Sequence, residues 1–396
     1  MPRSAAQAAA RSLGRWGYER AWELLQAQRL EDFRRAVARA VSEMPARAVV
    51  VFPPSVRWGG PLRQRPKALA LALSRLGCLV FYCEPPHSSA LGAGLRSVQA
   101  GLFLARVPRQ AFSELASPIV FVLSYNGGYL SAFHEPRVVY EVIDHLGVFP
   151  NRRLVAREHP RLLRLAEVVV TTSEALWSEA ARTRPDTLLS SNGVDYEEVR
   201  AAIRSPGRPP EDLQALVEAG KPLVGYYGAL ARWLDYDLLL QVALKRPDLE
   251  FLLIGPNFDG SLRALQTQPL ANLHWIGPRP PDVLLGYLRY FDATMIPFRV
   301  DPLTDAASPL KLFEYMAAGK PVVATPTQEL RRFAEVFTGR DPDGFSQAID
   351  QALAARGDDG YLARLDRVAR EHDWSQIARP ILERLGIGRE GKAEGR

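Results

Sequence analysis

Short apolar runs alternate with helical stretches along most of the chain. The runs of the first half fall at 48–52, 78–84, 102–107, 118–125, 138–144, 168–173 and 187–193. The runs of the second half fall at 222–228, 249–255, 273–277, 293–298 and 321–326. Most are continuous rather than alternating, which is typical of parallel strands covered by helices on both faces. The pattern therefore predicts an α/β protein with two doubly wound domains, whose ligands bind beyond the carboxyl ends of the strands.

A segment rich in proline and charge, 204–222, separates the two sets of strands. Such a composition is typical of a linker, here with room for one short helix. We therefore expect a first domain at 47–205 and a second domain of similar size at 206–373.

Residues 1–46 precede the first predicted strand and carry a helical pattern of their own. The apolar positions are Trp22, Leu25, Phe33, Val37, Val41 and Met44, and the arginines mostly off this stripe are Arg20, Arg34, Arg35 and Arg39. One interpretation is a helix packed on the first domain. The other is a basic amphipathic helix lying on an anionic membrane surface. Trp16 and Trp22 favour the membrane helix, while Glu31 and Asp32 weigh against it.

Composition places the chain among ordinary soluble globular proteins. Of its 396 residues, 47% are apolar and 24% are charged. No apolar run suits a transmembrane helix or a signal-peptide core. The net charge of +6 is spread along the chain, so nucleic acid is not an expected partner, whereas an anionic ligand or lipid surface is compatible with it. Cys78 and Cys83 point to opposite faces of one strand, so we expect buried thiols in a cytoplasmic protein.

The stretch 305–326 contains an unusual helix start. Ser308 and Pro309 suit an N-cap and a first helical position. The first turn then carries Lys311, although the helix dipole favours acids there, and Glu314 follows on the same face. The position of Lys311 is explained if an anion binds at this helix start. The alternative is a surface pair of Lys311 with Glu314, which would contribute only about 0.2–0.5 kcal/mol.

Several segments of the second half have a recognisable order and spacing. They read PLVGYYGALARWLDYDLLL, PDLEFLLIGP, NLHWIGPRPPDVLLGYLRYFDATMIPF and SPLKLFEYMAAGKPVVAT. Together they resemble the donor domain of GT-B glycosyltransferases, closest to the retaining family 4 and its bacterial polysaccharide-synthesis members. WGGPLRQRPKALALALSRLGCLVFYCEPP and LLSSNGVDYEEV resemble their first domain. The likeness implies two Rossmann-like domains facing across a cleft, an extra N-terminal helical segment, and a final helix in 374–396 that crosses back to the first domain.

The resemblance implies a ligand for the helix that starts near Ser308. In such enzymes the helix opened by Ser308, Pro309 and Leu310 meets the diphosphate and sugar of a nucleotide-sugar donor. Lys311 is then assigned to the diphosphate, and Glu314 matches the glutamate that binds the donor ribose.

Further donor-site residues follow from their positions in the family pattern. Gly228 ends the first strand of the second domain, where a small residue lets the backbone approach phosphate, and Arg232 matches the family's cation just beyond it. Gly255 ends the next strand and either forms a turn there or contacts the nucleotide. Arg279 falls where relatives hold the base. The alternative for Arg232 is an ordinary solvated side chain.

The first domain contributes two pairs of residues to the resemblance. Gly59 and Gly60 match the family's glycine loop facing the diphosphate. The alternative is that they are ordinary turn residues. Asp144 and His145 end the predicted strand 138–144 at the cleft. Relatives often carry consecutive acids there, so His145 is a departure. It either orients the acceptor or donor sugar or has a structural role.

Ala306 is a second departure. It stands where the family has the first of two glutamates, the one that reaches the transferring sugar. Asp301 or Asp305, or the backbone amides of 305–309, would have to replace that glutamate.

The resemblance implies a retaining glycosyltransferase that moves a sugar from a UDP- or GDP-linked donor to a glycan or lipid-linked acceptor in cell-surface polysaccharide synthesis. No metal and no other cofactor is expected, because ligand spacings of histidine, cysteine and acids are missing from the sequence. The expected location is the cytoplasm, with contact to the inner membrane face as an alternative. Two other functions remain open: a nucleotide-sugar epimerase, and a non-catalytic relative that binds a glycan or partner.

Overall fold

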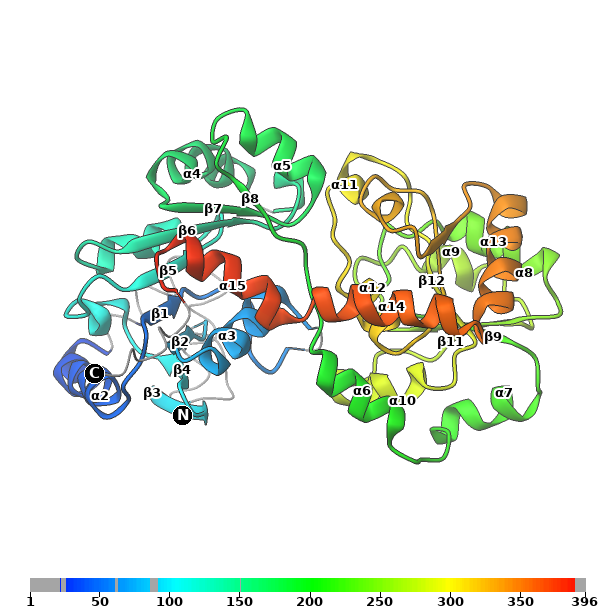
Figure 1. Cartoon of the computed structure of the whole chain (residues 1–396), viewed down its shortest axis with the longest axis horizontal. Coiled ribbons are helices and arrows are strands. Elements are labelled where there is room, and N and C mark those ends of the chain that lie inside the picture. The colour runs from blue at the N-terminus through cyan, green and yellow to red at the C-terminus, as the bar shows by residue number, and fades with distance from the viewer. Residues whose placement is uncertain (1–21, 23–25, 61–62, 86–91, 150, 389–396) are drawn as a thin grey trace, which may run out of the picture.

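The computed structural model of the protein describes residues 22, 26–60, 63–85, 92–149 and 151–388. Two sheets form two lobes that lie side by side (Figure 1). Both sheets are parallel apart from one edge strand, and helices cover their faces. The predicted α/β class with two doubly wound domains is confirmed.

The first sheet has the strand order β3-β4-β2-β1-β5-β6-β7-β8. Its strands are β1 Val49–Phe52, β2 Leu79–Cys83, β3 Gly94–Gln99, β4 Leu102–Arg106, β5 Ile119–Val122, β6 Arg137–Val142, β7 Val168–Thr171 and β8 Leu188–Leu189. Only β3 pairs antiparallel, with β4. The sequence did not predict β3, because this edge strand is partly exposed and lacks the apolar run that marks the central strands.

The helices of the first lobe are α3 Arg65–Arg75, α4 Arg152–Leu165 and α5 Glu174–Ala181, with short 3-10 turns η2 Arg109–Phe112, η3 Gly127–Ala132 and η4 Leu146–Val148. The last helix, α15 Trp374–Arg384, packs on α3 and lies on this lobe in Figure 1. Its Trp374, Ile377 and Ile381 join the core around Leu69 and Leu73 of α3. The last helix of the described residues therefore crosses back to the first lobe.

The second sheet has the order β11-β10-β9-β12-β13-β14, and all its pairs are parallel. Its strands are β9 Leu223–Tyr227, β10 Glu250–Ile254, β11 Leu273–Trp275, β12 Ala293–Ile296, β13 Val322–Ala324 and β14 Val336–Thr338. The strand order reverses between β9 and β12, so their carboxyl ends form the switch point where ligands of such sheets bind. The sequence missed β14, a strand of only three residues.

The helices of the second lobe are α6 Tyr196–Arg204, α7 Gln214–Glu218, α8 Tyr236–Lys245, α9 Arg263–Gln266, α10 Pro281–Leu288, α11 Pro302–Asp305, α12 Leu310–Ala317, α13 Pro342–Ala355 and α14 Asp359–Glu371, with 3-10 turns η5 Glu211–Leu213 and η6 Leu330–Arg332. Tyr196 and Val199 of α6 are buried in the second core. By packing, α6 lies with the second lobe, although the predicted boundary at 205 assigns it to the first.

The described part of the N-terminal helical segment packs on the first lobe. After a 3-10 turn, η1 Ala27–Arg29, helix α2 spans Leu30–Glu43. Phe33 and Val37 are 3% and 2% exposed and pack against the β2 and β4 side of the first sheet. The arginines of α2 form ion pairs on its outer face: Arg34 with Glu31, Arg35 with Asp32 and Arg39 with Glu43. The apolar face is thus used inside the protein rather than turned to a membrane, while Leu25, Trp16 and Arg20 lie outside the described residues.

Cys78 and Cys83 are both buried free thiols, as predicted. Burial raises the pKa of Cys78 to about 11 and that of Cys83 to about 12, so neither is a reactive thiolate near neutral pH.

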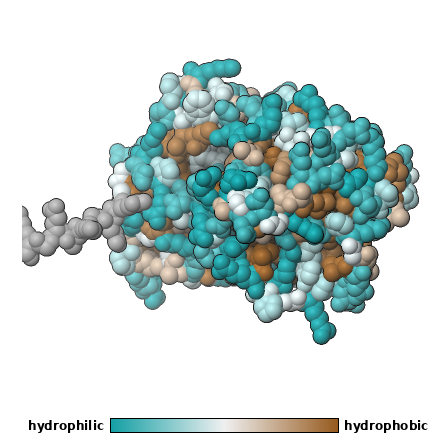
Figure 2. All heavy atoms as spheres, turned by 45° about the vertical axis from the view of Figure 1, so that its right-hand side comes forward, coloured by the Kyte–Doolittle hydropathy of each residue, from teal (hydrophilic) through white to brown (hydrophobic). Residues whose placement is uncertain are grey.

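In the part of the chain that the structure describes, no helix combines the length and apolar character that crossing a membrane requires. The face drawn in Figure 2 is largely hydrophilic, and its apolar atoms form separate patches.

Candidate active site

Helix α12 begins at the carboxyl edge of the second sheet, with Pro309 as its N-cap residue and no side-chain cap. The prediction that Ser308 caps this helix was wrong. The Ser308 hydroxyl accepts a hydrogen bond from the backbone N–H of Asn192 (3.1 Å), and its carbonyl accepts one from the Asn192 side-chain amide (2.6 Å). Because Ser308 is bound to the first-lobe loop, its hydroxyl does not satisfy the first amides of α12.

Lys311 lies in the first turn of α12 with its ammonium over two aromatic rings. The Nζ atom is 4.9 Å from the centre of the Tyr226 ring and 5.4 Å from that of Phe298. Part of the side chain reaches solvent, yet burial lowers the pKa of Lys311 from 10.5 to about 8, with the charge of Glu314 opposing that shift. Among the described residues no carboxylate forms an ion pair with it. Glu314 is thus the acidic neighbour whose charge reaches Lys311, but it does not form a direct ion pair with it.

Glu314 lies one turn further on and is also inside the protein. It is 6% exposed, accepts a hydrogen bond from the Tyr227 hydroxyl (2.6 Å) and lies 3.7 Å from Arg63 of the first lobe. The surface-pair alternative for Lys311 and Glu314 is therefore excluded. Arg63 is shared with Glu198, to which it makes two hydrogen bonds of 2.5 and 2.7 Å. Glu314 of the second lobe thus faces Arg63 of the first.

Two glycines bring the backbone close to Lys311. Gly228 has φ +140°, and a Cβ there would lie 2.8 Å from the Lys311 Cε. Gly255 has φ +153°, and a Cβ there would lie 1.8 Å from the carbonyl oxygen of Gly228. The positive φ favours glycine at both positions, and at Gly255 the backbone of Gly228 also leaves no space for a side chain. The structure therefore brings together Gly228, Gly255 and Lys311 at the strand ends.

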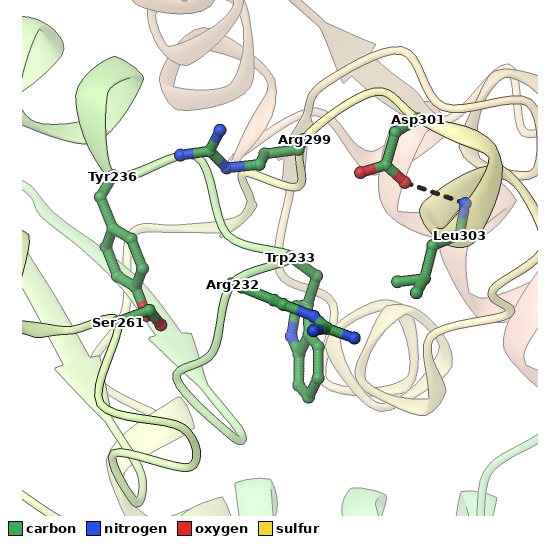
Figure 3. Close-up of a pocket in the computed structure, with 7 residues that line it drawn as sticks. All are labelled: Arg232, Trp233, Tyr236, Ser261, Arg299, Asp301 and Leu303. Carbon is green, nitrogen blue, oxygen red and sulfur yellow. Dashed lines mark hydrogen bonds between the residues drawn. The ribbon is translucent and has the colours of Figure 1, made fainter. Parts of the chain in front are cut away.

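Arg232 lies in a separate pocket at the same edge of the sheet (Figure 3). The pocket has a volume of about 310 Å³ and is lined by Arg232, Trp233, Tyr236, Ser261, Arg299, Asp301 and Leu303. Its walls come from the loops after β9, β10 and β12, so it occupies the topological switch point. Lys311 and Glu314 do not line it. The sequence did not single out Trp233 or Arg299. Their positions just after β9 and β12, where ligands of such sheets bind, could have identified them.

Arg279 is occupied by other partners. Its guanidinium donates hydrogen bonds to the Tyr287 hydroxyl (3.0 Å) and the Ile276 carbonyl (2.7 Å), and it forms an ion pair with Asp212 of the linker. The Arg279 charge is thus neutralised by Asp212. If the nucleotide base of a donor binds here, as the resemblance implied, the neighbouring backbone would have to contact it.

Gly59 and Gly60 form a turn after β1. The Gly60 amide donates to the Arg57 carbonyl (3.1 Å), and a Cβ at Gly59 would meet nothing within 4 Å. Residues 61–62, which follow, lie outside the described part. Neither glycine has a positive φ, and their diphosphate contact stays a prediction.

Asp144 and His145 follow β6, as predicted, and behave differently. Asp144 keeps some solvent access, but burial raises the pKa of its carboxyl group to about 7. The His145 Nδ1 accepts a hydrogen bond from the Gly147 amide (3.1 Å) and caps η4. The His145 ring therefore has a local structural partner, whereas Asp144 is a carboxyl group that titrates in the range useful for proton transfer.

The loop before α12 shows how Ala306 is accommodated. Ala306 is 2% exposed, packs in a first-lobe core cluster, and its carbonyl accepts a hydrogen bond from the Ser173 hydroxyl (2.9 Å). Asp305 accepts from the Gln328 amide (2.7 Å). Asp301 caps α11 through one carboxylate oxygen and lines the pocket. Of the two acids, Asp301 is the one placed where a ligand can reach it.

A buried polar network supports this loop from the first lobe. Arg65 and Glu141 are each 2% exposed at the side chain and form an ion pair of 2.8 Å. Arg65 also donates to the Ser191 carbonyl (2.7 Å) and approaches the Asn192 side chain (3.5 Å), and Asn192 in turn holds Ser308. Arg65 is therefore a structural residue, and Asn192, which the sequence did not single out, connects the two lobes.

Within the described residues, no group of three or more histidine, cysteine or acidic side chains is arranged to hold a metal ion.

The class of fold follows from comparison with solved structures. The chain resembles sucrose-phosphate synthase from Thermosynechococcus elongatus with a TM-score of 0.61 and 16% identity, over 85% of this chain and 97% of that one. It resembles a structure of Anabaena HepE in complex with UDP and glucose with a TM-score of 0.56 and 15% identity, over 85% and 99%. The protein has the GT-B fold, as the sequence predicted.

Two sequence comparisons are more specific. Residues 221–355, which span the second sheet, match the family model described as Glycosyl transferases group 1. A Bacillus subtilis protein, provisionally named teichuronic acid biosynthesis glycosyltransferase TuaH, is 30% identical over 250 residues. That match covers 60% of this chain and 61% of the relative, so it spans less than two thirds of the relative's length.

Proposed function

We propose that the protein is a glycosyltransferase that moves a sugar from a UDP- or GDP-linked donor to a glycan or lipid-linked acceptor, with retention, in cell-surface polysaccharide synthesis. The group 1 match over the second lobe and the TuaH relative support the reaction class. Two structures that share the fold, Anabaena HepE with UDP and glucose and an Escherichia coli trehalose-6-phosphate protein with UDP-2-fluoro glucose, support a nucleotide-sugar donor.

The observation that carries the proposal is the environment of Lys311. Its ammonium lies at the carboxyl edge of a doubly wound sheet, beside two glycines that must stay small and without a carboxylate partner among the described residues. A diphosphate supplies the missing negative charge and accepts hydrogen bonds from the uncapped amides of α12. Because burial has lowered the pKa of Lys311, the bound anion also stabilises its charged form.

Glu314 completes the donor site. A carboxylate next to a phosphate site is repelled by the ligand unless it accepts a hydrogen bond from a hydroxyl group. The ribose of a nucleotide supplies such hydroxyls. The Tyr227 hydroxyl orients the Glu314 carboxylate by donating to its Oε2 atom.

In the proposed reaction, the bond between the sugar anomeric carbon and the diphosphate oxygen breaks while the acceptor oxygen bonds to the same carbon. The acceptor arrives on the face that the diphosphate leaves, and a phosphate oxygen takes the acceptor proton. Lys311 and the helix amides stabilise the charge that develops on the diphosphate. Asp144, on the first-lobe side, orients the acceptor hydroxyl.

Ala306 supports a second candidate, a non-catalytic relative that binds a glycan or partner, because the acid expected at that position is missing. Incubation of the pure protein with a panel of UDP- and GDP-sugars tests the choice. A glycosyltransferase should release UDP or GDP slowly by hydrolysis, and a non-catalytic binder should release neither. A nucleotide-sugar epimerase would convert the sugar and keep the nucleotide attached.

A further inference from the structure

The pocket at the switch point of the second sheet carries more positive than negative charge and has no assigned ligand. Arg232 follows β9 and Arg299 follows β12, so two arginines line one pocket from neighbouring loops (Figure 3). Neither forms an ion pair with a carboxylate of the described residues. Asp259, which lies near Arg232, binds its backbone amide (3.0 Å) and is not a lining residue. The Arg299 Nε donates weakly to the Leu234 carbonyl (3.3 Å), which leaves the terminal nitrogens available.

The other walls have the character of a sugar site. Trp233 and Tyr236 give aromatic surface, and Trp233 packs against Phe258 with ring centres 5.8 Å apart. Phe258 is 63% exposed, so the aromatic surface continues beyond the pocket. Asp301 uses its Oδ1 atom to cap α11 and presents the remaining oxygen as an acceptor for hydroxyl groups.

The volume suits one sugar residue better than a whole nucleotide. About 310 Å³ lies at the lower end of the range for small-molecule pockets. Among the lining residues, two guanidinium groups face the single carboxylate of Asp301, which favours a ligand with a negative group. Asp259, just outside the lining, lies near Arg232 and reduces this excess of positive charge.

We infer that this pocket binds an anionic sugar, a pyranose whose carboxylate or phosphate is held by Arg232 and Arg299 while its ring lies on Trp233. The inference rests on the proposed function and gives it a substrate class. It also gives Arg232 a role different from the diphosphate contact that the sequence suggested. The anionic sugar is either the sugar of the donor or the terminal sugar of the acceptor, because both meet at this edge of the sheet.

The test measures binding of three probes to the full chain by saturation-transfer NMR, with and without UDP. Methyl glucuronide and glucose 6-phosphate are the anionic probes, and methyl glucoside is the neutral control. We expect at least one anionic probe to bind about tenfold or more tightly than the glucoside, as a charge-assisted contact allows. Arg299→Gln should remove that preference, while Arg340→Gln, a change at an exposed arginine elsewhere on the second lobe, should not.

A competition experiment identifies the source of the sugar. If UDP-glucuronate displaces the anionic probe, the pocket holds the donor's sugar; if both bind together, it holds the acceptor's. Trp233→Leu should weaken the charged and neutral sugars alike, because it removes the surface under the ring.

Equal binding of charged and neutral sugars, or an Arg299→Gln variant that keeps the preference, would overturn the inference. A loss of UDP affinity in Arg299→Gln would also overturn it, because the pocket would then belong to the diphosphate. UDP binding that is insensitive to Lys311 contradicts the proposed function instead, so the two failures are distinguishable.

Discussion

At the scale of single residues, the proposed donor site depends on charges placed inside the protein. Lys311 and Glu314 look like an ordinary surface pair in the sequence, since they stand three positions apart on a short helix. In the structure they have separate partners: aromatic rings surround Lys311, and Tyr227 holds Glu314. That difference, which depends on tertiary packing, is what makes both residues available to a ligand.

Glu314→Gln tests the assignment of the donor ribose. The change keeps the shape and one acceptor oxygen but removes the charge, so we expect a loss of about 1–2 kcal/mol in transition-state stabilisation, with a larger loss for Glu314→Ala. Steady-state transfer rates measure it, with the exposed Glu218→Gln as control. Inorganic pyrophosphate should bind equally or better, because a like charge has gone. Wild-type transfer rates in both Glu314 variants would mean that the donor site lies elsewhere.

Asp144→Asn tests the carboxyl group near the proposed acceptor. Burial raises the pKa of Asp144 from 3.8 to about 7, so the folded protein loses stability as pH rises from about 4 to 7 and its carboxyl group ionises at a cost. The asparagine variant avoids that cost. Its melting temperature should exceed that of the wild type above pH 7, and the difference should vanish near pH 4. A difference that does not change with pH would show that the carboxyl group is not desolvated.

The sequence alone identified residues whose position in the chain requires a particular residue type. It did not identify residues whose role depends on a partner that lies far away in the sequence. Gly228 and Gly255 were identified at strand ends, and their positive φ and close backbone contact explain why. Ser308 was misassigned as a cap, because its partner Asn192 lies 116 positions away. No local pattern contains that contact.

At the scale of elements, the predicted strands were accurate because both faces of these sheets are buried. The central strands are continuous apolar runs and need no alternation to be recognised. The missed strands, β3 and β14, lie at sheet edges, where burial is incomplete and the sequence signal is weak. The sequence also did not predict the pocket at the switch point, because its lining residues come from three loops that are separate in the chain.

Phe33→Ala tests the role of helix α2. Phe33 is 3% exposed in the core that α2 shares with the first sheet, so its loss should destabilise the protein by about 3–5 kcal/mol. Arg35→Ala, on the exposed outer face, is the matched control and should change stability by less than about 1 kcal/mol. Chemical denaturation measures both. Equal stability of the Phe33→Ala variant and the wild type would indicate a loosely attached segment and reopen the membrane interpretation.

At the scale of the whole molecule, the loop 305–309 connects the lobes. Ala306 and Ser308 belong to the second lobe by sequence but are bound by Ser173 and Asn192 of the first. Leu310, the first residue of α12, packs on the first-lobe core as well. The start of α12 is therefore held by both lobes. If the donor binds at this helix as proposed, its binding should depend on the relative position of the lobes.

Asn192→Asp tests that coupling. The change places a carboxylate oxygen against the Ser308 carbonyl, where the wild type has an amide donor 2.6 Å away. We expect the lobes to separate, with an increase in the radius of gyration measured by small-angle X-ray scattering. Ser205→Asp, on the exposed end of α6, is the control and should leave the radius unchanged. An unaltered radius in Asn192→Asp would show that this contact does not hold the lobes together.

The central claim is that Lys311 binds the diphosphate of a nucleotide-sugar, and calorimetric titration of UDP and GDP into the wild type and Lys311→Ala tests it most directly. Removing a charge-assisted hydrogen bond should weaken binding of the preferred nucleotide by about 1.5–3 kcal/mol. The variant should stay folded and be at least as stable as the wild type at pH 7, because burial of this charge is unfavourable without a ligand. Equal affinity of both proteins for UDP and GDP would contradict the account.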